Sequence, residues 1–102
     1  MNRLFLLVSL SILCCDGYGE YRVEDYVKGI EVPWGMTWLP GGDMLVTNRD
    51  GELYRVSDRK IVGTINGVPE VDANGQGGLL DIELHPDYAD NGWLYLSYSS
   101  SA

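Results

Sequence analysis

Short runs of apolar and alternating residues, separated by turn residues, fill most of the chain after its first twenty positions. Period-two alternation is typical of β-strands, and proline or glycine between the runs is typical of tight turns. The runs expected to form strands are residues 36–39, 44–47, 52–56 and 61–65, followed by two that begin at Leu79 and Trp93. Helical periodicity is nearly absent from this part of the chain. The pattern therefore predicts an antiparallel β meander.

Turn chemistry separates the expected strands. Residues 40–43, Pro-Gly-Gly-Asp, and residues 48–51, Asn-Arg-Asp-Gly, connect the first three, and the Asp-Gly pair is a strong hairpin signal. Residues 57–60 lead into the fourth strand. A polar, glycine-rich connection at 72–78 and a turn at 85–92 then frame the second group of strands.

The strand, proline turn, strand unit occurs twice. It is present from Gly35 to Thr47 and, in modified form, from Asn74 to Tyr98, with Pro40 and Pro86 46 residues apart. That spacing is close to the roughly 40 to 45 residue period of a four-stranded propeller blade, and a β-sandwich has no reason to repeat the unit at this distance. The sequence predicts an all-β propeller, of which this chain supplies about one and a half blades. Because such repeats need about three copies for a continuous core, we expect the chain to be the N-terminal part of a longer protein.

The first nineteen residues have the three regions of a secretory signal. A basic start at 1–3 precedes an apolar run at 4–13, and Gly17 and Gly19 follow. The apolar run is too short to cross a bilayer core of about 30 Å as a helix. We expect cleavage after Gly19, a mature part at 20–102, no stable membrane insertion, and a periplasmic or secreted location.

The two cysteines, Cys14 and Cys15, fall within this signal, so no disulfide is inferred for the mature part. A lipoprotein anchored through Cys15 is the alternative. The residues at 12–14, Ile-Leu-Cys, lack the usual small residue before the anchored cysteine.

The formal net charge is −8, and the acidic residues are scattered rather than clustered. This balance is typical of a solvated surface. Nucleic acid is disfavoured as a partner because phosphate binding needs a basic face. The basic residues of the mature part are few: Arg22, Lys28, Arg49, Arg55, Arg59 and Lys60.

A combination of motifs carries a family resemblance. The segments are VPWGM at 32–36, LPGG at 39–42, LVTNR at 45–49, GVPEV at 67–71, and GQGGLLDIELHPDY at 75–88 with LSY at 96–98. Together they resemble the start of the soluble glucose/sorbosone dehydrogenase family, the quinoprotein aldose sugar dehydrogenases. The resemblance extends from about Gly29 to Ser99, and GQGGLLD with HPDY nearby is its most specific part.

The resemblance implies a secreted six-bladed β-propeller that holds pyrroloquinoline quinone (PQQ), with calcium, over one end of its central channel. Such enzymes oxidise the anomeric hydroxyl of an aldose to a lactone and pass electrons to an acceptor. The general base is a histidine in a later motif, expected beyond Ala102, so no catalytic residue is assigned within this chain and the chain alone is expected to be inactive. The alternative is a non-enzymatic secreted propeller that binds glycans or proteins on the same scaffold.

Gln76 is the strongest candidate for a binding residue, together with Gly77. It lies between two glycines, Gly75 and Gly77, where the absence of side chains allows close approach to the backbone. Its amide both donates and accepts hydrogen bonds, which suits a sugar hydroxyl or a quinone carbonyl. By resemblance this glutamine lines the substrate and cofactor pocket. The alternative is that 74–78 is an ordinary glycine-rich turn.

The single histidine, His85, lies in a turn beside Pro86, and we expect a structural or solvent-facing role for it. Asp81 and Glu83 are expected to form the polar face of a strand. The oxygen-bearing residues Asp87, Asp90 and Asn91 are interpreted as an Asx-rich turn, with a calcium site as the alternative.

Four large side chains remain. Trp34, Trp38 and Trp93 are expected to pack between sheets, with stacking on a planar cofactor as the alternative. Arg49, at a strand end, is expected to be a surface arginine, with a place on the functional rim as the alternative.

Overall fold

Six strands and one helical turn form the secondary structure of residues 19–101, which are the residues that the computed structural model describes. The strands are β1 (Pro33–Trp38), β2 (Met44–Asn48), β3 (Leu53–Ser57), β4 (Lys60–Thr64), β5 (Leu79–Leu84) and β6 (Leu94–Tyr98), and the helical turn is α2 (Tyr88–Asn91). The predicted signal segment, with Cys14 and Cys15, lies outside the described residues apart from Gly19. Between residues 19 and 101, no helix has the length and hydrophobicity needed to cross a membrane.

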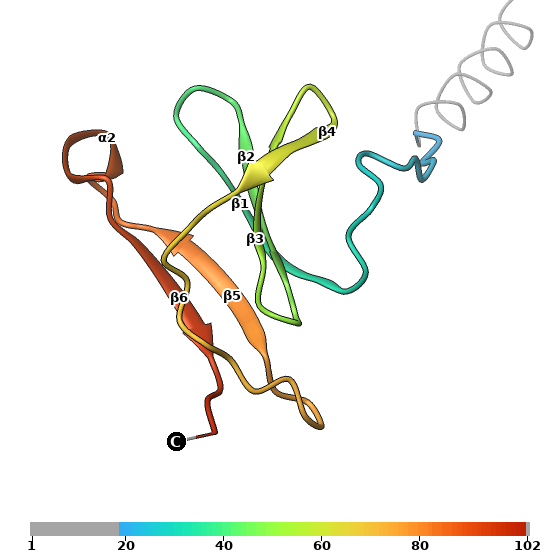
Figure 1. Ribbon diagram of the computed structural model, residues 1–102. Helices are drawn as coiled ribbons and strands as arrows, with labels where there is room; N and C mark the ends of the chain where they lie inside the picture. The colour runs from blue at the N-terminus through green and yellow to red at the C-terminus, as the bar shows by residue number, and fades with distance from the viewer. Residues whose placement is uncertain (1–18, 102) are drawn as a thin grey trace, which may run out of the picture.

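The strands form two antiparallel sheets. The first is a four-stranded meander in the order β1-β2-β3-β4, and the second is the β5–β6 hairpin (Figure 1). Each strand of the meander pairs with the next one along the chain, which is the arrangement of a propeller blade. The sequence-based prediction of an antiparallel all-β fold is confirmed, and the six strands lie within a few residues of the predicted runs.

Left-handed backbone at two turns sets the path of the meander. Gly42 has φ +100° in the β1–β2 turn, where its N–H donates to the carbonyl oxygen of Leu39 at 2.9 Å. Asp58 and Arg59, both with positive φ, form the two-residue β3–β4 connection. Two consecutive left-handed residues give a hairpin turn whose twist matches that of the flanking strands.

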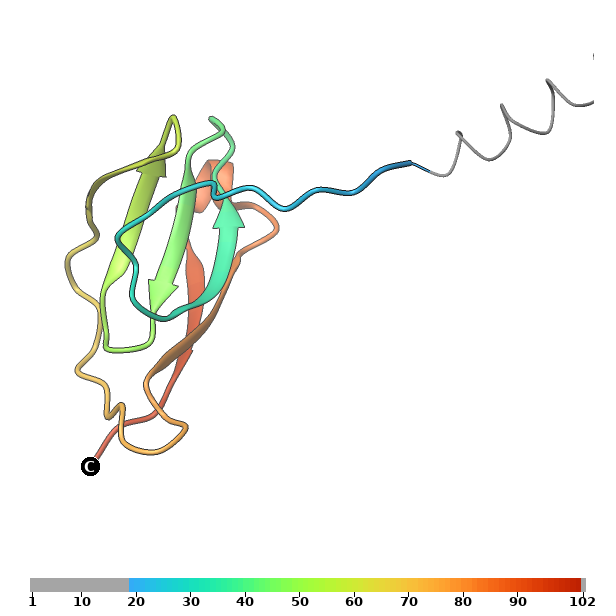
Figure 2. The same ribbon diagram turned by 90° about the vertical axis from the view of Figure 1, so that its right-hand side faces the viewer.

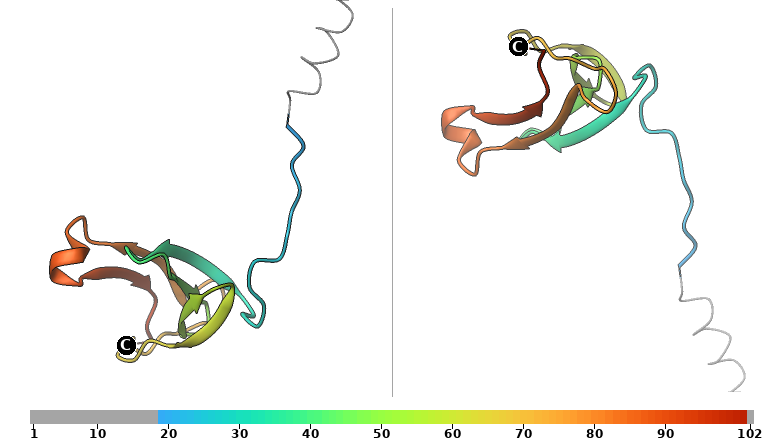
Figure 3. Two further views of the ribbon diagram at one scale, coloured as in Figure 1. Left: turned by 90° about the horizontal axis from the view of Figure 1, so that it is seen from above. Right: turned by 90° about the horizontal axis from the view of Figure 1, so that it is seen from below.

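An aliphatic core lies between the two sheets. Leu45 and Leu53 of the first sheet meet Leu79 and Ile82 of β5, and each of the four is at most 5% exposed. Figure 3 shows β5 running beside β1, and β5 also packs against β2. Burial of each such side chain stabilises the packing by about 1.5–3 kcal/mol.

The other face of the first sheet is covered by the segment that precedes β1. Met44, Val46 and Val56 form a second buried cluster, against which Val27 and Ile30 pack. Figure 2 shows this segment crossing the sheet. Because both faces of β2 are covered, all five of its residues are buried.

Three register shifts interrupt the strand pairing, and the one in the β3–β4 pair lies between Arg55 and Val56. The β1–β2 register shifts between Pro33 and Met36, and the β5–β6 register shifts between Leu79 and Ile82. Because the bulge in β5 inserts an extra residue, Leu79 and Ile82 are both buried in the core although they are three positions apart. Asp81 and Glu83 are exposed between the more buried Leu80, Ile82 and Leu84, so their predicted place on the polar face of a strand is confirmed.

The prediction that the three tryptophans pack between the sheets is wrong. Trp34, Trp38 and Trp93 are 54%, 52% and 63% exposed. Trp38 makes an edge contact with Tyr26, with ring centroids 6.1 Å apart. The core between the sheets takes aliphatic side chains instead, because β2, β3 and β5 supply leucine and isoleucine at their inward positions.

Candidate functional site

The candidate site is the glycine loop, residues 72–78, which leads into β5. It lies at the same end of the sheets as the β2–β3 turn, at the bottom of Figure 1. This placement follows from the meander, in which every second connection returns to the same end.

The side chain of Arg49, in the β2–β3 turn, holds this loop from within. Its Nε donates to the carbonyl oxygen of Gly77 at 2.8 Å, and one terminal nitrogen donates to that of Ala73 at 2.6 Å. The same nitrogen also donates to the carbonyl oxygen of Gly75. Arg49 is half-buried, and its Nε and one terminal nitrogen are engaged, so the expectation of an ordinary surface arginine is wrong.

The main chain of Arg49 is anchored as firmly as its side chain. Its N–H donates to the carbonyl oxygen of Val32 at 3.0 Å, and its own carbonyl accepts the N–H of Leu79 at 2.9 Å. One residue therefore connects the β2–β3 turn to the start of the first sheet and to the start of the second.

Ser99, just after β6, closes the base of the glycine loop. Its hydroxyl donates to the carbonyl oxygen of Asp72 at 2.7 Å and accepts the N–H of Gly78 at 2.8 Å. Its main chain adds two more hydrogen bonds, since Asp72 N–H donates to Ser99 O at 2.8 Å and Ser99 N–H donates to Gly78 O at 3.0 Å. Both ends of the loop are thus fixed to the second sheet.

Close packing explains the glycines at the C-terminal end of the loop. A Cβ on Gly77 would lie 2.3 Å from Ser99 Oγ and 2.6 Å from the carbonyl oxygen of Asp72. A Cβ on Gly78 would lie 2.2 Å from the carbonyl oxygen of Arg49, and its φ is +130°. The missing side chain of Gly77 therefore makes room for Ser99, and a binding role for Gly77 stays a prediction.

Gln76 lies exposed at the tip of the glycine loop, between the exposed Gly75 and the half-buried Gly77. A Cβ on Gly75 would meet nothing within 4 Å. Within residues 19–101, the Gln76 amide side chain makes no hydrogen bond, so both its donor and its acceptor are available. The flexible Gln76 side chain is thus presented on a backbone that the side chains of Arg49 and Ser99 hold through five hydrogen bonds.

The surroundings of the loop are acidic. Asp50, Glu52 and Glu70 line a neighbouring surface hollow, together with Gly51, Val68, Pro69 and Val71. The Nε and one terminal nitrogen of Arg49 are directed at loop carbonyls, and the tip of the loop offers amide groups to a ligand. These groups fit an uncharged oxygen, such as that of a hydroxyl or a quinone carbonyl.

His85 lies at the opposite end of β5 from the glycine loop. Its Nδ1 accepts the N–H of Asp87 at 2.9 Å and lies 3.1 Å from Asn91 Nδ2. Its ring contacts Trp93 and Tyr95, with centroids 6.0 and 6.1 Å away. These contacts close the connection between β5 and β6.

The same connection contains the other acidic candidates. Asn91 N–H donates to Asp87 O at 3.0 Å, and Asn91 Oδ1 accepts the N–H of Trp93 at 2.8 Å. This is the geometry of a helical turn that continues into an Asx turn. No group of three or more His, Cys, Asp or Glu side chains able to hold a metal ion occurs within residues 19–101.

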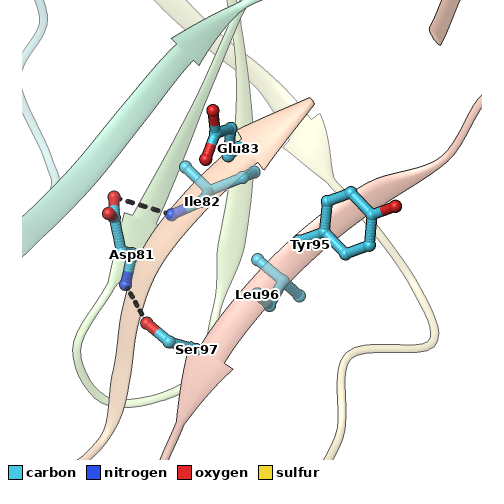
Figure 4. A pocket seen from close by; sticks show the side chains of 6 residues that line it. All are labelled: Asp81, Ile82, Glu83, Tyr95, Leu96 and Ser97. Carbon is cyan, nitrogen blue, oxygen red and sulfur yellow. Dashed lines mark hydrogen bonds between the residues drawn. The ribbon is translucent and has the colours of Figure 1, made fainter. Parts of the chain in front are cut away.

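A separate shallow pocket of about 190 Å³ lies on the β5–β6 hairpin (Figure 4). Its lining residues are Asp81, Ile82, Glu83, Tyr95, Leu96 and Ser97. Asp81 N–H donates to Ser97 Oγ at 2.9 Å, and Asp81 Oδ1 accepts the N–H of Ile82 at 2.8 Å. These polar groups serve the local bulge, and the lining includes no residue of the glycine loop.

Comparison with known proteins gives consistent matches. The family model described as Glucose / Sorbosone dehydrogenase matches residues 30–102. The aldose sugar dehydrogenase YliI of Escherichia coli is 38% identical over 95 residues, which are 91% of this chain and 26% of that protein. Quinoprotein glucose dehydrogenase B of Acinetobacter calcoaceticus is 35% identical over 75 residues, 70% of this chain and 16% of that protein.

One solved structure is that of the PQQ-bound form of an aldose sugar dehydrogenase from Streptomyces coelicolor. It superimposes with a TM-score of 0.63 and 34% identity over 80% of this chain and 25% of that one. The chain therefore spans about a quarter or less of the length of these relatives.

Proposed function

Because the chain belongs to the glucose/sorbosone dehydrogenase family, we propose that it is the N-terminal part of a PQQ-dependent sugar dehydrogenase. In this proposal the first sheet is one blade of a six-bladed propeller and the β5–β6 hairpin begins the next. The reaction is oxidation of the anomeric hydroxyl of an aldose to a lactone. Bound PQQ supplies a two-electron acceptor, and an external acceptor then removes the electrons. Export through a signal at residues 1–19 and a calcium ion beside the quinone, bound by residues outside 19–101, belong to the same proposal.

The observation that carries the proposal is the placement of Gln76. An exposed amide with free donor and acceptor stands at the tip of a loop whose backbone is fixed by Arg49 and Ser99. A fixed backbone lowers the entropic cost of ordering the side chain on a ligand. Gln76 is thus suited to orient a sugar hydroxyl or a quinone carbonyl.

Proton removal from the sugar is assigned to a histidine outside this chain. His85 is the single histidine of the sequence, and it lies at the far end of β5 from Gln76 with Nδ1 engaged by the turn. A general base must reach the proton that it abstracts, directly or through one water molecule. His85 and Gln76 therefore cannot act on the same hydroxyl.

The test is dye reduction by the full-length protein, loaded with PQQ and calcium and offered a panel of aldoses. We expect aldose-dependent reduction with lactone as the product. Gln76→Ala should lower kcat/KM by about 3- to 10-fold, the effect of losing one hydrogen bond to an uncharged partner. Asn74→Ala, a change to an exposed amide of the same loop, is the matched control and should leave kcat/KM unchanged.

Absence of dye reduction by the loaded protein would remove the enzyme proposal. Glycan or protein binding by such an inactive protein would instead support the alternative of a propeller that only binds. Equal loss of activity in both variants would show that the loop matters for folding and not through Gln76.

A further inference from the structure

We propose that Arg49 is a positioning residue that orients the peptide between Gly75 and Gln76, so that the N–H of Gln76 serves as a second donor beside the side-chain amide. This inference rests on the proposed function, in which Gln76 meets a ligand oxygen. The main-chain N–H of Gln76 then binds the ligand, and Arg49 fixes the orientation of that N–H.

The first step is the convergence of alternate carbonyls on one guanidinium. Ala73, Gly75 and Gly77 each direct a carbonyl oxygen at Arg49, while the residues between them do not. The guanidinium is planar and presents several N–H donors in a fixed fork. It can therefore hold three carbonyls in one arrangement, which the single ammonium of a lysine cannot match.

The second step concerns the opposite side of each peptide. No cis peptide occurs in the described residues, and in a trans peptide the N–H points away from the carbonyl. When a carbonyl is directed at Arg49, the N–H of the following residue must face away from it. The three peptides held by Arg49 thus direct the N–H groups of Asn74, Gln76 and Gly78 outward.

Two of these three outward groups have partners within the protein. Asn74 N–H donates to Asp72 Oδ1 at 3.0 Å, and Gly78 N–H donates to Ser99 Oγ at 2.8 Å. The N–H of Gln76 donates to no residue between 19 and 101. Of the three N–H groups that face away from Arg49, that of Gln76 is therefore the one available to a ligand.

The consequence is a pair of donors on one residue. The main-chain N–H and the side-chain Nε2 of Gln76 can both reach an oxygen placed above the loop tip. Two neutral donors favour an uncharged, electron-rich oxygen, which is the chemistry of a quinone carbonyl or of a sugar oxygen. Separate titrations with PQQ alone and with aldose distinguish these two sources.

The direct test deletes the N–H, and it also makes the Gly75 carbonyl a weaker hydrogen-bond acceptor. Replacement of the Gly75–Gln76 peptide by an ester in the full-length protein deletes this donor and leaves the guanidinium and the glutamine side chain in place. We expect an approximately 3- to 10-fold weaker Kd for PQQ, measured by titration without sugar, if the oxygen belongs to the quinone. If it belongs to the sugar, KM should rise by the same factor while kcat and the PQQ Kd stay unchanged.

Arg49→Lys tests the positioning role, and Arg55→Lys is its control, because Arg55 pairs with Asp43 away from the loop. Arg49→Lys should speed hydrogen exchange of the loop amides and reproduce the weakening seen with the ester, whereas Arg55→Lys should do neither. Should Arg49→Lys fail to fold, the ester variant still decides the question.

The inference is overturned if the ester variant binds PQQ and sugar as the wild type does while Gln76→Ala binds more weakly. In that case the proposed function stands and only the main-chain role falls. If neither the ester nor Gln76→Ala changes binding, the proposed site itself is wrong.

Discussion

Thr47 Oγ1 donates a hydrogen bond to the carbonyl oxygen of Leu80 across 2.5 Å. The same hydroxyl accepts the N–H of Gly35 at 2.9 Å. Gly35 and Leu80 both lie within the bulges of their strands, where a ladder partner is missing. The fully buried Thr47 hydroxyl on β2 is therefore the hydrogen-bond partner of the Gly35 N–H in the first sheet and of the Leu80 carbonyl in the second.

Replacement of Thr47 by valine should destabilise the protein strongly for so small a change. Valine has the same shape, but it leaves the Gly35 N–H and the Leu80 carbonyl without their partner. An unsatisfied buried group costs about 1–3 kcal/mol. Urea unfolding of the full-length protein measures the loss, and Thr47→Ser, which keeps the hydroxyl, should be clearly less harmful. Equal stability of Thr47→Val and wild type would show that water replaces the hydroxyl.

Alanine at Gly78 should be among the most damaging changes in the glycine loop. The new Cβ would meet the carbonyl oxygen of Arg49 at 2.2 Å, and the backbone has φ +130°. Neither the main chain of Arg49 nor that of Gly78 can move without breaking hydrogen bonds, so we expect a loss above about 2 kcal/mol.

Gly41→Ala is the control for this change. Gly41 lies in the β1–β2 turn with open space around it and no positive φ. Its replacement should alter the free energy of unfolding by less than about 0.5 kcal/mol. Thermal melts of both variants give the comparison, and similar melting temperatures would contradict the steric argument.

His85→Ala should affect stability and not chemistry. The variant loses the acceptor for Asp87 N–H and the ring contacts with Trp93 and Tyr95. We expect a loss of about 1 kcal/mol and an unchanged kcat. Steady-state kinetics and urea unfolding separate the two effects. A large fall in kcat of the folded variant would indicate a catalytic role for His85.

Asp43 gives a pH dependence whose sign follows from its contacts. The Ser57 hydroxyl and the Arg55 guanidinium hold the pKa of this carboxyl below its ordinary value of 3.8. A lowered pKa in the folded state means that the stabilisation is present above 3.8 and is lost as the pH falls below it. Asp43→Asn should therefore be slightly less stable than wild type at neutral pH, and thermal melts of the two should converge in strong acid. Parallel curves at all pH values would rule out this contribution.

The order and nature of the strands could be predicted because they depend on local pattern. Period-two alternation and Gly or Pro turns marked all six, and the repeat around Pro40 and Pro86 marked two equivalent hairpins. The bulges could not be predicted, since an extra residue such as that near Asp81 is fixed by contacts with another sheet. The tryptophans were misplaced because an apolar side chain alone does not say which face of a strand is covered.

The candidate site was predicted in part. Gln76 and its glycines stood out from composition and from the family resemblance, but the role of Arg49 did not. Its partners are main-chain carbonyls 24 to 28 positions away. Because every residue has such a carbonyl, the sequence does not indicate which ones bind the arginine. The available signal was the coincidence of an arginine at a strand end with a glycine-rich connection expected at the same end of the sheet.

The convergence of Ala73, Gly75 and Gly77 on one guanidinium has an evolutionary consequence. An inserted or deleted residue between these carbonyls would change which of them face the guanidinium, and the arginine would lose hydrogen-bond partners. Evolution can therefore exchange the side chains at positions 74 and 76 while the number of residues in this stretch stays constant. Ligand preference in this lineage should diversify here by replacement alone.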